Sequence, residues 1–439
     1  MARATIEKMF SPNIVDSLFE THARIQYQDK LLFSSVFHAM CLVSTRSHKS
    51  LHGAYRQMKD SLDVTVKSLY NKVNGVESTV CHSLVRHSAD TALTLVKDWI
   101  PRMEGVKGYR LKVIDGNHIS GTQHRLKVLR NQPAAALPGL SVVVLLPEVG
   151  LIEDVIPWED AYIQETQLLG PVIQRIEAKD LILADRLYCT SDFIFEIAAR
   201  NACFVIRQHT GHLRWKLIGE PKSLGRTETG QLFEQEVELT HPRTGVDLGV
   251  RRITVKLDQP TRNKDEELHI LTNLPASDAT AQKVAELYRK RWTIETAFKE
   301  MTTTLQCELN TLGYPAAALF SFSIAAVCFN VLSVIVTALR HTHSNELEHG
   351  VSYYALATEV SSTYSGMMIA LPAEEWVRFQ DMTHEQLCQK LQEWAKQADV
   401  SRYKKLKRSS SPKRSKRAYG GKKHVATSRL LSAKKGDPT

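Results

Sequence analysis

The sequence predicts an α/β fold, and three observations carry that prediction. Short β-branched runs separated by turn residues begin after Gly108 and are typical of strands: YRLKVIDG, LSVVVLLP and LIEDVIPW. Helical and strand patterns alternate after these runs. Through most of the first 105 residues, apolar residues recur at three- and four-residue spacing, which indicates helices.

Along the middle of the chain the predicted order of elements is β-β-β-α-β-α-β. After the three runs come a helix at QETQLLGPVIQRIEA, a buried strand at DLILAD, a helix at SDFIFEIAARN with a Ser/Asp cap, and a strand at ACFVIRQ. This is the order of the ribonuclease-H-like fold, a mixed five-stranded sheet with flanking helices. We expect such a core, interrupted by a second β-rich block at QLFEQEVEL, VRRITVKLD and LHILTNLP.

These patterns divide the chain into five regions. They are a helical N-terminal region (1–105), a ribonuclease-H-like core (106–207 and 276–340), a β-rich insertion (208–275), a helical C-terminal region (341–400) and a basic tail (401–439). The tail holds fourteen Lys or Arg and one acid, so it carries +13, whereas the whole chain carries +10 and the other 400 residues −3. Such a segment buries too little apolar surface to fold alone, and we expect it to be disordered. Two roles fit it: a nucleic-acid arm that neutralises phosphates, which we favour, and a solubilising tail.

A DNA-binding role also fits part of the N-terminal region. The stretch DVTVKSLYNKVNGVES begins with an acid and a threonine at a helix start, and its helix ends at Asn74-Gly75. It is consistent with the second half of a helix-turn-helix placed in a DNA groove. A plain helical hairpin in a bundle fits it equally well.

The segment 316–339, AAALFSFSIAAVCFNVLSVIVTAL, has no charge over a length able to span a bilayer. Its polar residues are spread around it, and its flanks show no positive-inside pattern. We favour a helix buried on all sides in the fold over a membrane span. The seven cysteines are scattered without a CxxC pair, which indicates neither a disulfide framework nor a zinc knuckle and favours a reduced, cytoplasmic compartment.

Three carboxylates are the candidate catalytic residues. Asp115 in VIDGNHISG and Asp185 in LILADRLY close two strands. Glu295 in LYRKRWTIETAFKEM lies on a helix predicted over 278–305 and capped at residue 277 or 278. Acids at two strand ends and on a later helix can converge on a pair of Mg²⁺ ions, which suits in-line displacement at phosphorus.

The same helix brings further groups to the third acid. At 3.6 residues per turn, Tyr288, Arg291 and Glu295 share one face, and Lys299 lies one turn beyond. The guanidinium is suited to clamp a phosphate, and Trp292 beside the stripe offers a face on which an unpaired base can stack. A solvated surface helix with alternating charges fits the same residues.

Two neighbours of the strand-end acids are weaker candidates for contact with DNA. Arg186, beside Asp185, either contacts a phosphate or balances the local charge. His118 follows Asp115 closely enough to touch a substrate, and a turn role fits it equally.

These motifs carry a resemblance. Tyr-x-x-Arg-x-x-x-Glu on a helix, after a strand-end Asp-Gly and a strand-end Ala-Asp-Arg, resembles the DDE transposases of the insertion-sequence-four family, cut-and-paste bacterial enzymes with a Tyr–Arg–Glu–Lys signature. The resemblance covers roughly residues 108–340. It implies that the three acids bind the catalytic metal ions and that Tyr288 and Arg291 hold the terminal phosphate of the cleaved strand. The signature lysine, expected at Thr302, is absent, and Lys299 on the same face is its candidate substitute.

The resemblance further implies a transposase that uses two Mg²⁺ ions, for which Mn²⁺ can substitute. Such an enzyme cleaves double-stranded DNA at the element ends, in relatives by way of a hairpin, and transfers the strands into target DNA. It implies a homodimer in a synaptic complex, in the bacterial cytoplasm at the nucleoid. Two alternatives stay open: a catalytically inactive, transposase-derived DNA-binding protein, and a ribonuclease-H-like nuclease without strand transfer.

Overall fold

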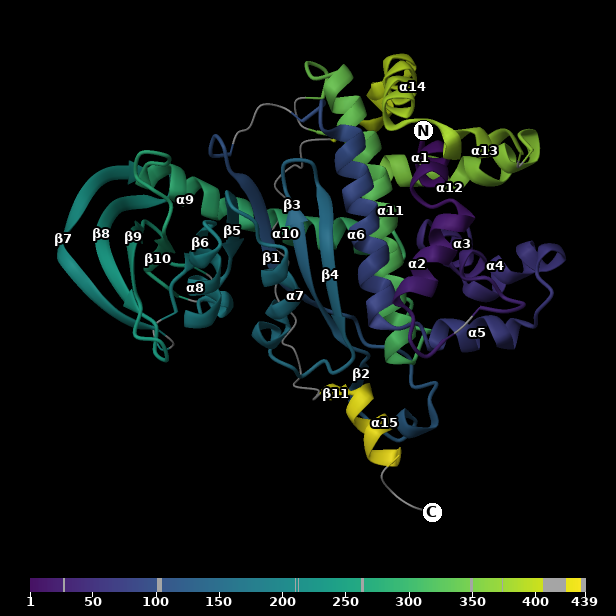
Figure 1. The fold of residues 1–439 in the computed structure, drawn as a ribbon, viewed down its shortest axis with the longest axis horizontal. Helices are drawn as coiled ribbons and strands as arrows, with labels where there is room; N and C mark the ends of the chain where they lie inside the picture. The colour runs from purple at the N-terminus through teal and green to yellow at the C-terminus, as the bar shows by residue number, and fades with distance from the viewer. Residues whose placement is uncertain are drawn as a thin grey trace.

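A mixed nine-stranded sheet runs through the protein (Figure 1). The computed structural model describes residues 1–26, 28–100, 105–209, 211, 213–261, 264–347, 350–372, 374–405 and 424–435. From one edge to the other, the strands are β4 (Leu151–Trp158), β3 (Leu140–Leu146), β1 (Arg110–His118), β5 (Asp180–Ala184), β6 (Cys203–Arg207), β10 (Glu267–Thr272), β9 (Asp247–Leu257), β8 (Gly230–Thr240) and β7 (Arg214–Thr227). β5 is parallel to both β1 and β6, and the other neighbours are antiparallel. The prediction of a mixed α/β fold is confirmed.

The sheet has nine strands where the sequence predicted five, because the β-rich block at 208–275 continues the sheet. β10 pairs with β6, with Ile270 opposite Arg207. The outer edge of β6 would otherwise present unpaired backbone groups, and the block satisfies them. The sequence pattern does not predict β7, since Pro221 and two glycines interrupt its apolar pattern. Its position at the exposed edge tolerates these residues.

Both faces of the β1–β5 part of the sheet are buried. Val113 and Leu183 belong to the larger of two apolar cores, whereas their neighbours Ile114 and Ile182 belong to the smaller one. The larger core includes residues of α6 (Ser78–Val96), α9 (Ala281–Arg289), α10 (Thr293–Thr304) and α11 (Pro315–Thr342). The smaller core includes residues of α7 (Leu169–Gln174) and α8 (Ser191–Ala199). This part of the sheet is therefore a layer between two sets of helices.

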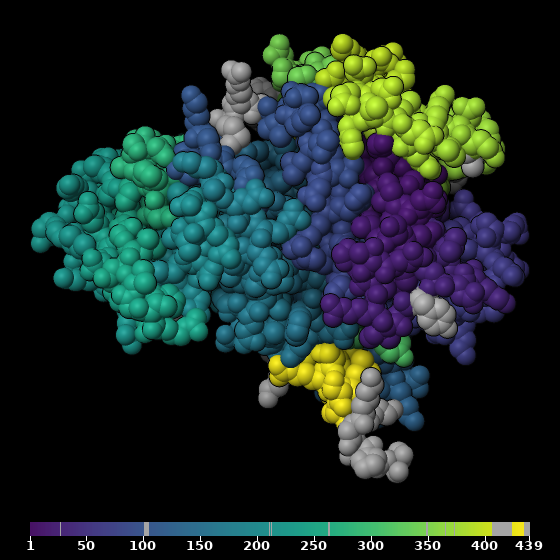
Figure 2. Space-filling view, in the orientation of Figure 1, coloured from purple at the N-terminus to yellow at the C-terminus, as the bar shows by residue number. Residues whose placement is uncertain are grey.

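The N-terminal and C-terminal helices pack together at one end of the molecule (Figure 2). The first set is α1 (Ala2–Met9), α2 (Pro12–His22), α3 (Phe33–Ser44), α4 (Leu51–Met58) and α5 (Val66–Asn74). The second set is α12 (Tyr353–Ala370), α13 (Glu374–Asp381) and α14 (His384–Gln397). α1 packs on α13, and Lys8 Nζ donates to the carbonyl of Gln380 at 3.0 Å. Residues far apart in the sequence thus share this end of the fold.

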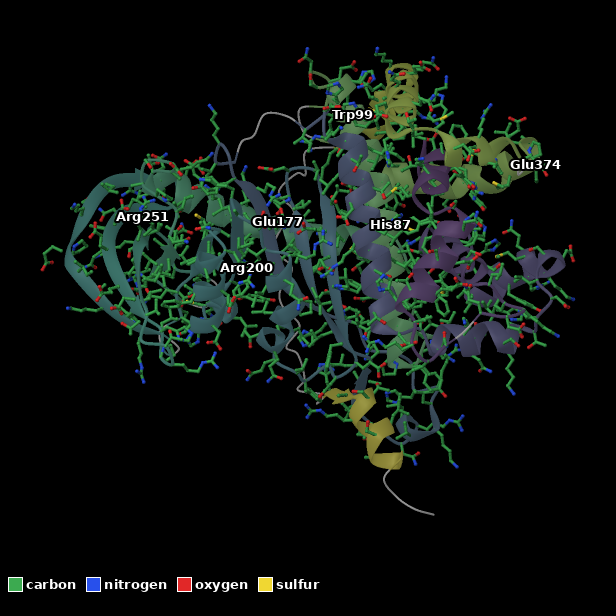
Figure 3. All side chains as sticks on the ribbon, in the orientation of Figure 1. His87, Trp99, Glu177, Arg200, Arg251 and Glu374 are labelled. Carbon is green, nitrogen blue, oxygen red and sulfur yellow. The ribbon has the colours of Figure 1, made fainter. Side chains whose placement is uncertain are left out.

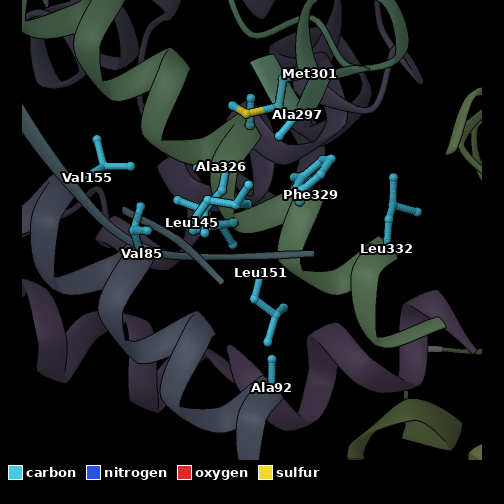
Figure 4. Packing of buried hydrophobic residues seen from close by; sticks show 14 of the residues in the cluster. Val85, Ala92, Leu145, Leu151, Val155, Ala297, Met301, Ala326, Phe329 and Leu332 are labelled. Atoms are coloured by element: carbon cyan, nitrogen blue, oxygen red, sulfur yellow. The ribbon is translucent and has the colours of Figure 1, made fainter. Parts of the chain in front are cut away.

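The uncharged segment forms α11, the central helix of the larger core. α11 is long and apolar enough to cross a membrane, and its most apolar stretch is entirely buried inside the protein. Figure 4 shows Ala326 and Phe329 of α11 among side chains of α6 and of the sheet, including Val85, Leu145 and Val155. The favoured interpretation, a helix buried on all sides in the fold, agrees with this packing.

The end of the chain docks onto the fold near the loop between β1 and β3. β11 (His424–Ala426) pairs in parallel with β2 (Ala135–Leu137), and α15 (Thr427–Lys435) follows (Figure 1). Arg429 forms an ion pair with Asp160 at 2.8 Å. These residues differ from the disordered tail that their composition predicts, because the edge of β2 offers backbone partners and Thr427 becomes fully buried. Residues 406–423 and 436–439 of the predicted tail lie outside the described residues.

One buried amide ties α11 to the sheet. Asn330 Oδ1 accepts from the backbone N–H of Ile152 at 2.7 Å, and its Nδ2 donates to the Ile152 carbonyl at 2.8 Å and to Ser88 Oγ at 2.7 Å. Asn330→Ala leaves both backbone groups of Ile152 without these partners. We expect a loss of at least about 2 kcal/mol in the free energy of unfolding, measured by urea denaturation.

The matched control is Ser323→Ala on the same helix. The Ser323 hydroxyl donates to the Leu319 carbonyl within α11 and also bonds the Cys81 thiol, so its loss leaves neither backbone group of Ile152 without its partner and should cost about 1 kcal/mol or less. Equal losses in the two variants would contradict the role of Asn330.

Candidate active site

The parallel pairing of β1 with β5 brings the first two acids together. In this pairing Val113 lies opposite Leu183. Asp115 and Asp185 each come two residues later in the sequence. The sequence predicted that Asp115 ends its strand. This prediction is wrong, because β1 continues to pair with β3 as far as His118. Parallel partners point to the same face of a sheet, so both carboxylates project toward the face covered by α9 and α10.

A turn of 3-10 helix follows the second acid and fixes its side chain. This turn, η4 (Arg186–Tyr188), begins directly after Asp185. Asp185 Oδ1 accepts from the backbone N–H of Leu187 at 2.7 Å and so caps the turn. The carboxylate therefore has a defined direction at the point where β5 leaves the sheet.

The helix that carries the third acid is broken. The sequence predicts one helix over 278–305, but the structure has α9, a 3-10 turn η5 (Lys290–Trp292), and α10. The cap is Thr280, whose hydroxyl accepts from the backbone N–H of Lys283, and not residue 277 or 278. Asp278 instead accepts from the hydroxyl of Tyr109 at 2.7 Å, which explains why it is not free to cap the helix.

An arginine on β9 anchors the segment that leads into α9. Arg251, labelled in Figure 3, donates to the carbonyls of Leu274 and Ala279 at 2.8 and 2.9 Å. It also forms an ion pair with Glu234 at 2.5 Å. The β-rich insertion therefore helps to set where α9, and with it the third acid, begins.

The guanidinium of Arg291 joins the first acid to the third. Its Nη1 lies 3.1 Å from Asp115 Oδ2, and its Nη2 lies 3.0 Å from Glu295 Oε1. The Arg291 side chain is 11% exposed and that of Asp115 is 19% exposed, so their ion pair is largely shielded from water, whereas Glu295 is 57% exposed and its ion pair with Arg291 faces solvent. Asp115 and Arg291, which are 176 positions apart in the sequence, thus meet, and Arg291 links Asp115 to Glu295.

Burial and neighbouring charges shift two proton equilibria here. Burial raises the pKa of Asp115 to about 7, with Asp185 and Glu165 adding to the rise and Arg291 opposing it. Burial also raises the pKa of Tyr288 to about 12, again opposed by Arg291. At neutral pH, Tyr288 therefore keeps its proton and can donate a hydrogen bond, while Asp115 is divided between its two forms.

The other predicted DNA contacts lie around this centre without joining it. Trp292 is 64% exposed, and its ring centroid lies 6.0 Å from the Arg291 guanidinium carbon. Lys299 is exposed on α10 and, in the part of the chain that the structure describes, makes no ion pair with the acids. His118 and Arg186 are exposed, at the end of β1 and on η4 respectively.

Two groups near the site were missed by the sequence analysis. Glu165, in the 3-10 turn η3 (Glu165–Leu168), accepts from the Tyr188 hydroxyl at 2.7 Å and acts on the charge of Asp115. Arg46 follows α3 and donates to the carbonyl of Thr302, the position without the signature lysine, at 3.3 Å. No periodic pattern marks either residue. The sequence holds one indirect sign of Glu165, which is the glycine at position 116: a side chain there would collide with the Glu165 carboxylate.

The donor set fits a hard divalent cation in chemistry. Asp115, Asp185 and Glu295 offer carboxylate oxygens, the ligands that Mg²⁺ prefers. Within the described ranges, no three acidic, His or Cys side chains are arranged to hold an ion. Arg291 lies between two of the acids. A bound cation and this guanidinium would therefore compete for the same oxygens.

The model of the family described as "Transposase DDE domain" matches residues 107–331, just over half of the chain. The chain belongs to this family. No curated protein matches it. The matched part of the transposase begins before β1 and ends within α11, so it contains the acids, the β-rich insertion and the α9–α10 pair. A transposase DDE domain is an enzyme that acts on DNA, and such domains generally use divalent metal ions.

The raised pKa of Asp115 makes a stability prediction for the metal-free transposase. The folded protein holds this proton more tightly than the unfolded chain, so the carboxyl contributes stability below about pH 4 that is lost as the pH rises to about 7. Asp115→Asn cannot ionise. In EDTA at pH 8 we expect it to melt roughly 2–4 °C above the wild type.

The comparison at pH 4.5 is the control, because the carboxyl of the folded wild type is then protonated, and the difference in melting temperature should be much smaller than at pH 8. A variant that melts below the wild type at pH 8 would show that the Arg291 ion pair outweighs the burial of the charge.

Proposed function

We propose that this chain is a cut-and-paste transposase of the insertion-sequence-four family, which cleaves DNA at the ends of its element and joins them to target DNA. The observation that supports this most is the Arg291 bridge: it joins Asp115 to Glu295 beside Asp185. The order β4-β3-β1-β5-β6 within the sheet supports a ribonuclease-H-like core that carries these acids. In this proposal the three acids are the catalytic residues.

The three acids would hold two Mg²⁺ ions, and Mn²⁺ would substitute for them. When bound, such ions activate the attacking oxygen and stabilise the leaving oxygen of an in-line displacement. Asp115 has to lose its proton to serve as a ligand, and its pKa of about 7 sets the pH above which it does so in the free protein. The lower limit for metal binding is therefore expected near neutral pH.

Arg291 and Tyr288 would receive the DNA backbone. The two Nη atoms of Arg291 donate to carboxylates, and its buried Nε has no hydrogen-bond partner among the described residues. A phosphate can accept from a guanidinium through two oxygens at once. Tyr288 is 8% exposed and keeps its proton, so its hydroxyl can donate to a second phosphate oxygen. A phosphate that draws Arg291 away would free the oxygens of Asp115 and Glu295.

The surrounding residues would hold the strands. Trp292 at the rim would stack on an unpaired base, because its exposed ring is backed by a guanidinium. Lys299, Arg186 and His118 would contact phosphates around the centre. The N-terminal region (1–105) would bind the element ends through α5, whose start is capped by the Thr65 hydroxyl, and the basic tail would add phosphate contacts.

The proposed reaction is a series of displacements at phosphorus in one site. Water first attacks the phosphodiester at the element end: a P–O bond to water forms, the bond to the 3′ oxygen breaks, and that oxygen leaves as a hydroxyl with a proton. The 3′-hydroxyl then attacks another phosphodiester, on the opposite strand to form a hairpin or on target DNA to join it. The ends would be paired by a homodimer in a synaptic complex, at the nucleoid of a bacterial cytoplasm.

One observation favours an inactive, DNA-binding derivative as a second candidate. Thr302 occupies the position of the signature lysine. Arg46 Nη2 contacts the carbonyl of that residue, so a basic group from the N-terminal region lies at this position.

The other alternative is a nuclease without strand transfer. A strand-joining assay distinguishes such a nuclease from a transposase.

The first functional test is Glu295→Gln. It keeps the shape of the side chain and removes its charge, so cleavage of DNA taken from the two flanks of the gene should fall at least about 10²-fold. Glu286→Gln on α9 is the matched control, since Glu286 is exposed and accepts from Gln282 on the same helix. Metal-dependent cleavage by the Glu295 variant at the wild-type rate would remove the assignment.

A second test concerns the absent signature lysine. Lys299→Ala and Arg46→Ala are each expected to weaken binding to end-containing DNA and to reduce its salt slope by about 1, as the loss of one phosphate contact does. The measurement is a titration of labelled DNA at several salt concentrations. An unchanged slope and normal joining in one variant would exclude that residue as the substitute.

A further inference from the structure

The backbone pairing that places Asp115 beside Asp185 stops short of both acids. The last paired residues of β1 and β5 are Val113 and Leu183 for this pair of strands. Beyond them β1 keeps its bonds to β3, while β5 turns into η4. The distance between the two acids is therefore not fixed by the sheet ladder alone, and some other contact has to hold it.

Glu165 makes that contact from the opposite face of the sheet. Its carboxylate lies so close to β1 that a Cβ at Gly116 would be 2.0 Å from Glu165 Cδ. Successive residues of a strand face opposite sides, so this contact lies behind Asp115 and away from Arg291. Glu165 Oε2 also accepts from the hydroxyl of Tyr188 at 2.7 Å.

Tyr188 connects this carboxylate to the second acid. It is fully buried, and its backbone N–H donates to the carbonyl of Asp185 at 3.3 Å. Glu165 thus touches β1 one residue after Asp115 and holds the turn that begins with Asp185. A third carboxylate behind two others repels the negative charge of Asp115, so its presence at this position is electrostatically costly.

We propose that Glu165 is a positioning residue of the transposase site: through Gly116 and Tyr188 it sets the separation of Asp115 and Asp185. This inference rests on the proposed function, because it treats both acids as ligands of one cation centre. Residues that orient metal ligands from behind typically change metal affinity 10–100-fold when they are removed.

The test is Mn²⁺ binding to the full-length protein without DNA, measured by electron paramagnetic resonance of free Mn²⁺. Glu165→Ala should weaken binding by about tenfold or more, and Tyr188→Phe should weaken it in the same direction. Glu165→Gln keeps an oxygen that can accept from Tyr188, so it should bind Mn²⁺ nearly as the wild type does. Glu236→Ala, an exposed residue on β8, is the matched control and should leave binding unchanged.

A double-mutant cycle tests the contact at Gly116. Gly116→Ala alone should weaken Mn²⁺ binding, since the new methyl group meets the Glu165 carboxylate. In Gly116→Ala with Glu165→Ala the collision is absent, so the double variant should bind no more weakly than Glu165→Ala alone. Fully additive losses would overturn the proposal.

Thermal unfolding in EDTA separates positioning from stability. A positioning role predicts that the Glu165→Ala variant loses Mn²⁺ affinity while its melting temperature stays close to that of the Glu236→Ala variant. If the Glu165→Ala variant does not fold, the same comparison is made with Tyr188→Phe. Suppose that the wild type binds Mn²⁺ and cleaves end-containing DNA. Equal Mn²⁺ affinities of the Glu165→Ala and Glu236→Ala variants would then overturn this inference and leave the proposed function standing. A wild type that binds no Mn²⁺ overturns the proposed function and this inference together.

Discussion

The parallel pairing of β1 with β5 is the constraint on which the candidate site depends. It aligns Val113 with Leu183 and so delivers Asp115 and Asp185 to one point of the sheet, on one face. Parallel strands need both faces covered, and the two apolar cores on either side supply that cover. α11 and α6 form much of the larger core, and Asn330 fastens α11 to β4. The chemistry at the strand ends thus rests on a deeply buried scaffold.

Charge compensation is the second theme of the site. Asp115, Asp185, Glu165 and Glu295 gather negative charge in a partly buried region, and Arg291 is the cation that offsets it in the free protein. Burial is the main cause of the raised pKa of Asp115, and the carboxylates of Asp185 and Glu165 add to it while the guanidinium opposes it. Carboxylates gathered in this way favour an added cation, which is the electrostatic basis of the proposed metal site.

The sequence anticipated much of this site because its signals are local. Asp115 and Asp185 follow apolar runs, and Arg291 lies close to both Tyr288 and Glu295 although a 3-10 turn separates α9 from α10. The break itself, the Thr280 cap and the docking of β11 on β2 were not predicted. Each depends on a partner distant in the sequence, as when Tyr109 engages Asp278.

From the residue pattern alone one could predict the α/β class, the β-branched strands, the three candidate acids and a preference for burial of the segment 316–339 inside the fold. The tertiary structure alone decided that the β-rich block extends one continuous sheet, that Arg291 links the first acid to the third, and that Glu165 lies behind Asp115. The physical reason is that periodicity reports which face of an element is buried. It carries no information about which distant edge, carboxylate or guanidinium completes the unpaired groups of that element.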